Sequence, residues 1–187
     1  MAGTIDVLKQ DPLKFLSVFR INIGTSKESR VEPAVYYGKK GSDLKFNTGF
    51  AIVDEPQKVE ICRAHIVQAK HGAPEFWELT GESDLMLTTQ LSGCCMILDD
   101  SGTVPKIAHV WPHTTACQCA NGSKDYESGT DVQTRLARLY PTCKLYGIND
   151  YIRSAAYVIG VNKGGWHFYA QERPDGGRIA RACEILI

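Results

Sequence analysis

The chain has 187 residues, 43% hydrophobic and 22% charged, which is the composition of an ordinary globular protein with one full core. Its 21 basic and 21 acidic residues cancel, so the composition does not favour broad binding to nucleic acids or to anionic membranes. No apolar run approaches the length of a membrane span, and residues 1–6 lack the basic and apolar regions of a secretory signal. We therefore expect a cytoplasmic protein, or one exported without a cleavable signal.

The seven cysteines are odd in number and irregularly spaced, in a chain too large to depend on disulfides for stability. We expect most of them to be reduced. They are Cys62, Cys94, Cys95, Cys117, Cys119, Cys143 and Cys183.

The first third of the chain predicts one helix and several strands. Asp11-Pro12 is a natural helix start, with Asp11 as the cap, and apolar residues follow it at helical spacing. Residues 23–34 are largely polar and predict a loop. Strands are expected at Ala34–Tyr37 and Lys45–Val53, whereas Val59–Lys70 fits a strand or a helix.

The middle of the chain predicts a β-hairpin. Cys94–Leu98 is a short apolar strand that ends at Asp99-Asp100-Ser101-Gly102, a turn by composition. Lys106–Trp111 then returns as the second strand and carries His109, 15 residues after Cys94 (109 − 94). A hairpin can bring these two side chains within reach of each other.

The last third predicts a helix followed by strands. Thr130 or Asp131 is a good cap for a helix through Arg138, which Pro141 stops. Strands are expected at Ala155–Val161, Trp166–Gln171 and Ile179–Ile187. Because no repeat, linker or low-complexity tract divides the chain, we predict an α+β fold with many antiparallel strand pairs, in a single domain over residues 1–187.

Cys94 and His109 are the strongest catalytic candidates. A cysteine directly after Ser92-Gly93 is well placed to present a thiolate at the mouth of a cleft, and Gly93 can adopt a positive φ there. A histidine on the paired strand suggests the base of such a nucleophile. The competing interpretation is structural, since free cysteines usually pack as small hydrophobic side chains.

Other groupings are weaker. Cys117 and Cys119, with His113 and His109, resemble metal ligands, but Cys-x-Cys lacks the usual two-to-four-residue gap and no second cysteine pair completes the set. We therefore expect no metal and no cofactor. His113 is the alternative base if the strand register differs.

The tetrapeptide Leu91-Ser92-Gly93-Cys94, with a histidine on the following strand, resembles a group of bacterial toxin deamidases: the catalytic domain of cytotoxic necrotizing factor and the Burkholderia lethal factor. Thr88 corresponds to a threonine in the lethal factor's site, and the spacing to His109 is similar to that in the necrotizing factor. Glu127–Gln133 resembles a Glu-x-Gly-Thr-Asp-x-Gln segment of the lethal factor. The resemblance covers roughly residues 83–138.

The resemblance implies a largely antiparallel, sandwich-like arrangement of sheets flanked by helices, and conversion of a protein glutamine to glutamate. Cys94 would be the nucleophile and His109 the base. Backbone N–H groups of Ser92, Gly93 and Cys94 would stabilise the oxyanion. Thr88 would orient the imidazole, although a strand threonine bonded to neighbouring backbone is the alternative interpretation of this residue.

The partner implied is a host protein, either the translation initiation helicase, favoured by chain length and the Glu127–Gln133 segment, or a Rho-family GTPase. The chain would then be a virulence toxin that acts as a monomer in host cytoplasm, with no direct contact to nucleic acid or membrane. Two alternatives remain open: a chemoreceptor-type deamidase of the bacterial cytosol, which uses similar Cys-His-Thr chemistry, and a non-enzymatic binding module on the same fold.

Overall fold

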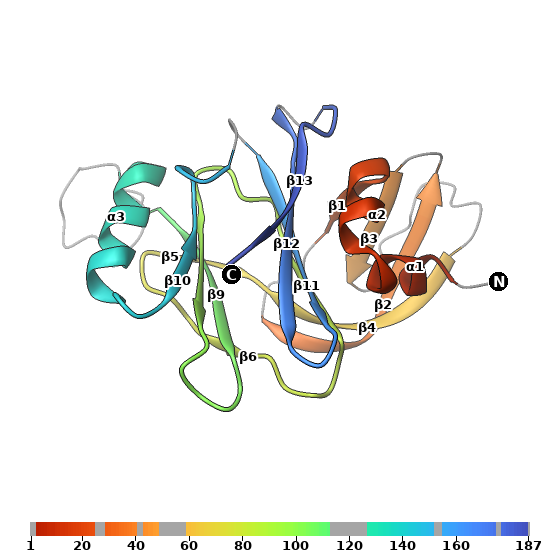
Figure 1. Ribbon diagram of the computed structural model, residues 1–187, viewed down its shortest axis with the longest axis horizontal. Coiled ribbons are helices and arrows are strands. Elements are labelled where there is room, and N and C mark those ends of the chain that lie inside the picture. The colour runs from red at the N-terminus through yellow and green to blue at the C-terminus, as the bar shows by residue number, and fades with distance from the viewer. Residues whose placement is uncertain are drawn as a thin grey trace.

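The computed structural model describes residues 3–24, 29–40, 43–48, 59–112, 127–151, 155–174 and 177–186. Within them the chain is a single α+β domain, built mostly of β-sheet with three helices (Figure 1). The helices are α1 (Thr4–Gln10), α2 (Pro12–Val18) and α3 (Gly129–Leu139).

Two sheets contain the described strands. The larger has eight, in the order β1-β3-β2-β4-β7-β11-β12-β13, and the smaller has the path β10-β8-β9-β5 with β6 paired to β9. Most neighbours are antiparallel; the pairs β1/β3, β4/β7 and β5/β9 are parallel. The strands are β1 (Arg20–Ile23), β2 (Arg30–Lys40), β3 (Asp43–Thr48), β4 (Val59–Val67), β5 (Ala69–His71), β6 (Trp77–Glu78), β7 (Leu85–Thr88), β8 (Cys95–Asp99), β9 (Lys106–Trp111), β10 (Lys144–Tyr146), β11 (Ala156–Asn162), β12 (Trp166–Glu172) and β13 (Arg181–Ile185).

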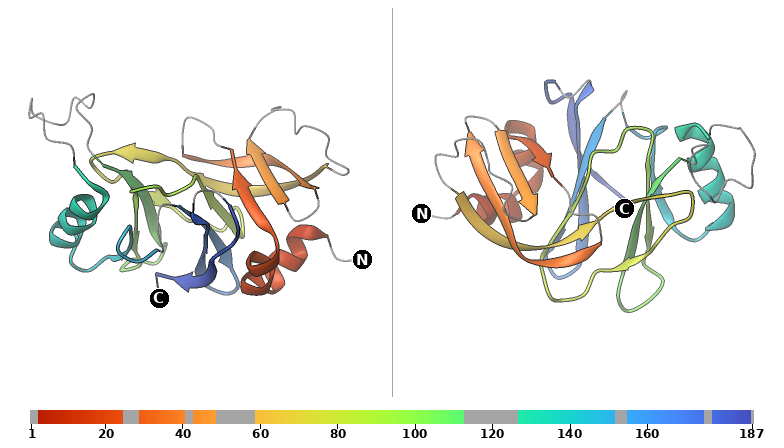
Figure 2. Two further views of the ribbon diagram at one scale, coloured as in Figure 1. Left: turned by 90° about the horizontal axis from the view of Figure 1, so that it is seen from above. Right: turned by 180° about the vertical axis from the view of Figure 1, so that it is seen from behind.

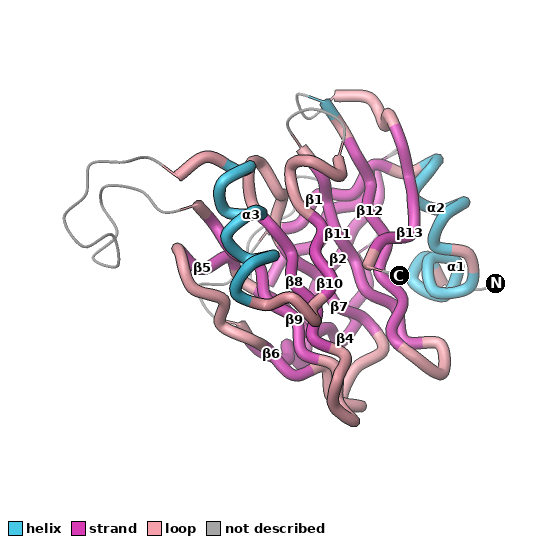
Figure 3. Tube along the Cα trace, turned by 60° about the vertical axis from the view of Figure 1, so that its left-hand side comes forward, coloured by secondary structure: helices cyan, strands magenta, loops and turns pink. Residues whose placement is uncertain are grey.

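Three buried clusters hold these layers together. The first includes residues of α1, α2 and the N-terminal strands, the second lies between the two sheets, and the third joins the small sheet to α3. Figure 2 and Figure 3 show the consequence: α1 and α2 lie at one end of the molecule and α3 at the other, with the strands between them. Cys94, the candidate nucleophile, belongs to the second cluster, between the two sheets.

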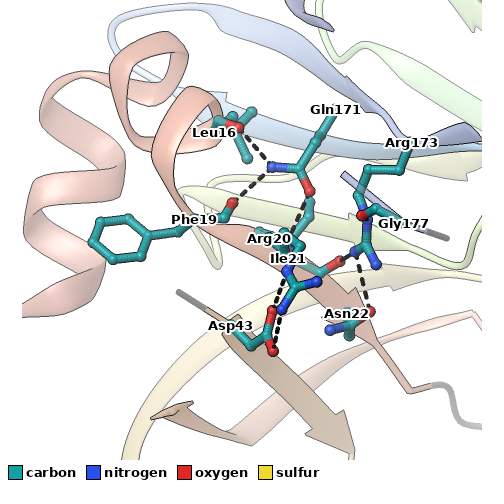
Figure 4. A network of polar contacts seen from close by, with 9 residues as sticks. All are labelled: Leu16, Phe19, Arg20, Ile21, Asn22, Asp43, Gln171, Arg173 and Gly177. Carbon is teal, nitrogen blue, oxygen red and sulfur yellow. Dashed lines mark hydrogen bonds and ion pairs between the residues drawn. The ribbon is translucent and has the colours of Figure 1, made fainter. Parts of the chain in front are cut away.

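Side chains from β12 and the residue after it form hydrogen bonds with the end of α2 and with β1, the edge strand of the same sheet (Figure 4). The Gln171 amide donates to the carbonyls of Leu16 and Phe19, at 2.6 and 2.7 Å, and accepts from the Ile21 N–H at 2.9 Å. Arg173 donates to the Ile21 carbonyl at 2.8 Å. Because Gln171 is fully buried, its amide makes these hydrogen bonds out of contact with water, as buried polar groups ordinarily do.

The predicted hairpin and C-terminal strands are confirmed, with shifts of a few residues. Cys95–Asp99 pairs antiparallel with Lys106–Trp111, and Asp11 caps α2 by accepting from the Lys14 N–H at 3.1 Å. Val59–Lys70 is strand rather than helix, divided between β4 and β5. Residues 49–53 of the predicted strand Lys45–Val53 lie outside the described residues.

Two predictions need correction, and some elements were not predicted. Residues 23–34 are not all loop, because β2 begins at Arg30 and pairs with β4. The cap of α3 is Ser128, two residues before the first predicted candidate; its hydroxyl accepts from the Asp131 N–H, and the Asp131 carboxylate accepts from the Ser128 N–H in return. Helix α1 and strands β1 and β10 were not predicted.

Candidate active site

Thr88 and His109 meet across the interior, one from each sheet. Thr88 ends β7 of the large sheet, and His109 lies in β9 of the small one. Their Oγ1 and Nδ1 atoms are 2.8 Å apart, and both residues are buried. The Thr88 hydroxyl also lies 2.6 Å from the Val67 carbonyl, which can only accept. The single hydroxyl proton therefore goes to Val67, and Nδ1 of His109 must carry the proton that Thr88 accepts.

This arrangement leaves Nε2 of His109 without a proton and without a hydrogen-bond partner among the described residues. His65, the other fully buried histidine of the described part, differs: its Nδ1 accepts from Trp77 at 3.1 Å and its Nε2 donates to the Thr80 carbonyl at 3.0 Å. Nε2 is one of five buried side-chain nitrogen or oxygen atoms of the described part that have no hydrogen-bond partner, and the only one of them that belongs to an imidazole, a group suited to exchange protons near neutral pH.

Cys94 faces the same interior as His109. Side chains alternate along the strand: Cys94 and Met96 belong to the cluster between the sheets, and Cys95 belongs to the cluster under α3. Met96 is the direct antiparallel partner of His109, so Cys94 is its diagonal neighbour on the same face. The predicted opposite facing of Cys94 and Cys95 is therefore confirmed, but both lie in buried clusters, and the predicted position of Cys94 at the mouth of a cleft is wrong.

Burial sets the protonation states of the pair. It lowers the pKa of His109 to about 3 and raises the pKa of the Cys94 thiol to about 11, although the Ser92 backbone amide lowers the latter in part. Both side chains are nearly inaccessible, at 1% and 2% exposed. In the free protein the Cys94 thiol and the His109 imidazole are therefore both neutral, unlike the preformed thiolate–imidazolium pair of many cysteine enzymes.

The connection between β7 and β8 is fixed at several points. Leu91 pairs with Ala156 through two backbone hydrogen bonds of 2.7 and 3.0 Å. Gly93 has φ of +85°, the left-handed conformation that glycine adopts most readily, as the sequence suggested. Its N–H donates to the hydroxyl of Tyr151 at 2.8 Å, so one of the predicted backbone donors to the oxyanion is already engaged.

The segment Glu127–Gln133 lies against this turn, although it is far from it in sequence. A Cβ at Gly129 would lie 2.8 Å from the Gly93 carbonyl oxygen, so only glycine allows the helix to begin so close. Gln133 binds the turn before Tyr151, accepting from the Asn149 N–H at 3.0 Å and donating to Asp150 at 2.7 Å. It supports the turn that precedes Tyr151.

His113, Cys117 and Cys119 lie outside the described residues, and no group of three possible metal ligands occurs within the described ranges. His71 stacks on Trp111 at a ring distance of 5.3 Å, and His167 pairs with Glu184 at 2.8 Å.

Sequence reasoning missed Tyr151 altogether. It lies 58 residues from Gly93, beyond α3, in a stretch with no motif. Only the tertiary fold brings its hydroxyl to the turn. Thr89, in contrast, adjoins a predicted residue, but its Oγ1 is 3.5 Å from Nδ1 of His109, at the limit of a hydrogen bond.

No protein-family model matches the chain, and no curated protein matches it. None of the helices in the described ranges has the length and apolar character needed to cross a bilayer.

Proposed function

We propose that this chain is a cysteine-dependent protein-glutamine deamidase. The observation that carries the proposal is the state of His109: Thr88 holds its Nδ1–H, its buried Nε2 has no hydrogen-bond partner among the described residues, and Cys94 is its diagonal neighbour across the hairpin. That is the arrangement a general base needs, with one ring nitrogen fixing the tautomer and the other ready to take a proton.

In the proposed reaction, Nε2 of His109 takes the thiol proton as Cys94 sulfur attacks the glutamine carboxamide carbon. The carbon–sulfur bond forms and the carbonyl electron pair moves to oxygen. The imidazolium then donates its proton to the amide nitrogen, the carbon–nitrogen bond breaks and ammonia leaves a thioester. Water, deprotonated by His109, cleaves the thioester to give glutamate and the free thiol.

The neutral resting pair makes this a general-base mechanism. A neutral imidazole is available as base at every pH above about 3, and the thiol loses its proton only when the substrate carbon is in position. Because the thiol and the imidazole are 2% and 1% exposed, binding of the substrate must open a path to them. A buried thiol also protects the nucleophile from oxidation between turnovers.

The substrate proposal rests on the resemblance to the two toxins. Contact between Gly93 and Gly129 supports it, since it joins the two segments that carry the resemblance, and so do two packed, largely antiparallel sheets. A host translation initiation helicase is the favoured target and a Rho-family GTPase the second. Action in the host cytosol, as a monomer, belongs to the same proposal.

The test is incubation of the protein with eukaryotic cell lysate, followed by peptide mass spectrometry for glutamines converted to glutamate. We expect one or a few sites with wild type and none with Cys94→Ser, a substitution that keeps side-chain size. Conversion of bacterial chemoreceptors instead would identify the chemoreceptor-type enzyme. No conversion in either lysate, with a folded wild type, would contradict the proposal and favour a binding module.

A further inference from the structure

The Tyr151 hydroxyl lies next to the backbone of Gly93 and Cys94, at the candidate nucleophile. It accepts from the Gly93 N–H at 2.8 Å and lies 3.4 Å from the Cys94 carbonyl oxygen. The side chain is 4% exposed and belongs to the same buried cluster as Cys94. The neighbouring ring of Tyr146, 5.7 Å away, turns its own hydroxyl elsewhere, to Glu172 at 2.9 Å.

Two features of this hydroxyl suit it to donate. Its hydrogen has only a weak acceptor, since 3.4 Å is long for an O–H···O bond. Its oxygen receives the Gly93 N–H, which polarises the O–H bond and makes the proton a better donor. Burial nevertheless raises the pKa of Tyr151 well above its ordinary value, and the nearby Cys94 raises it further, so the group keeps its proton.

We propose that Tyr151 is a catalytic residue whose O–H donates a hydrogen bond to the oxyanion formed when Cys94 attacks the glutamine carboxamide. This inference rests on the proposed function. In this proposal the Gly93 N–H stabilises the oxyanion only indirectly. It holds and polarises the Tyr151 hydroxyl, and that hydroxyl contacts the oxyanion. No proton is transferred, because the O–H proton stays on Tyr151 while the carbonyl electron pair is on the substrate oxygen.

A different assignment is possible for the same contact. A hydroxyl 2.8 Å from the Gly93 N–H lies where a substrate oxygen would lie if Gly93 itself were the donor. Tyr151 would then be a cover that the substrate displaces. The two assignments predict opposite effects of Tyr151→Phe, which removes the hydroxyl and keeps the ring: loss of turnover for a donor, and a more accessible, more active thiol for a cover.

The probe is butanal with a 13C-labelled carbonyl, an aldehyde with the chain length of a glutamine side chain. The Cys94 sulfur adds to its carbonyl carbon, and the thiol proton ends on the oxygen, giving a hemithioacetal that NMR detects without turnover. We expect Tyr151→Phe to bind butanal about tenfold more weakly, the effect of one hydrogen bond. Deamidation should fall about 100-fold or more, as for loss of one oxyanion donor.

Alkylation of Cys94 by iodoacetamide is the control reaction, because this displacement creates no oxyanion. Its rate in Tyr151→Phe should stay within about twofold of wild type. Tyr146→Phe is the matched control variant and should keep wild-type butanal affinity. Labelling with 3-fluorotyrosine, which makes phenols stronger donors while keeping every hydroxyl, should tighten butanal binding in wild type and not in Tyr151→Phe.

Each of the following four outcomes would overturn the inference. Unchanged butanal affinity in Tyr151→Phe removes the donor role. Equal losses in alkylation and in butanal binding mean that Tyr151 only shapes the turn. Faster alkylation with undiminished deamidation identifies a cover. Failure of wild type to bind butanal means that Cys94 has no oxyanion site. Butanal binding that depends on Tyr151, with no glutamine converted in any lysate, would instead contradict the proposed substrate and keep the donor.

Discussion

Thr88→Val is the most informative single change, because it removes one hydroxyl and keeps the shape of the side chain. In the wild type this hydroxyl donates to Val67 at 2.6 Å and accepts from Nδ1–H of His109 at 2.8 Å. The substitution leaves the buried Val67 carbonyl and the buried Nδ1–H without these partners. At about 1–3 kcal/mol for each of these two buried polar groups, we expect the free energy of unfolding to fall by about 2–6 kcal/mol.

The effect on catalysis comes through the tautomer of His109. A hydrogen bond worth about 1 kcal/mol favours the Nδ1–H form, and every 1.4 kcal/mol is about a factor of ten in an equilibrium, so its loss reduces the productive tautomer by about fivefold. The remaining imidazole is also less well oriented. We therefore expect kcat to fall about 10- to 100-fold, less than the roughly 10⁴-fold loss seen when a catalytic triad loses its orienting carboxylate.

Three measurements test this prediction: the deamidation rate, the thermal melt and the tautomer of His109 by 15N NMR. Thr89→Val is the matched control, because the Thr89 hydroxyl is 3.5 Å from Nδ1 and should contribute less than about a twofold effect. A folded Thr88→Val protein with wild-type kcat and an unchanged Nδ1–H tautomer would refute the reasoning.

Three further predictions follow from burial and pairing. Iodoacetamide should label Cys94 before Cys95. The rate of labelling should rise as the pH approaches about 11, because the Cys94 thiolate forms there. Peptide mapping that finds Cys95 labelled first would exclude Cys94 as the reactive thiol. The pKa of His109 is about 3 in the folded protein and near 6.5 in the unfolded chain, so between these pH values the unfolded chain binds one more proton. The free energy of unfolding should therefore fall as the pH decreases from 6.5 toward 3, by up to about 1.4 kcal/mol per pH unit. His109→Gln should flatten this slope in pH-dependent melts, and an unaltered slope would contradict the prediction. Gln171→Leu removes the hydrogen bonds to the Ile21 N–H and to the Leu16 and Phe19 carbonyls, and it should lower the free energy of unfolding by about 3 kcal/mol or more. A loss below about 1 kcal/mol in denaturant titration would show that the network is dispensable.

The parts of the fold with strong local signals were predictable. Asp99-Asp100-Ser101-Gly102 is a turn by composition, and the apolar strands on both sides leave little choice but a hairpin. The cap of α3 was misplaced, since Ser128, Thr130 and Asp131 are all capping residues and only tertiary packing of Gly129 on Gly93 fixes where the helix starts. Strand β1 pairs with β3, whose residues lie 23 positions further along the chain, and no local sequence pattern predicts such a contact.

The site divides in the same way. Cys94 and His109 follow from a hairpin register, and the opposite facing of Cys95 follows from strand alternation. The Thr88 contact came from the resemblance alone. Neither the burial of the pair nor the Tyr151 hydroxyl had any sequence signal, because both depend on how the two sheets close on each other.

The central claim is that Cys94 and His109 act as one catalytic unit. The most direct test compares the rates of glutamine deamidation in Cys94→Ser, His109→Gln and the double variant. Thermal melts establish that each variant is folded. His113→Gln is the control and should keep close to the wild-type rate. Residues that act together are strongly non-additive, so we expect each single variant to lose about as much activity as the double variant. A folded His109→Gln protein that deamidates at close to the wild-type rate, or single losses that multiply in the double variant, would contradict the claim.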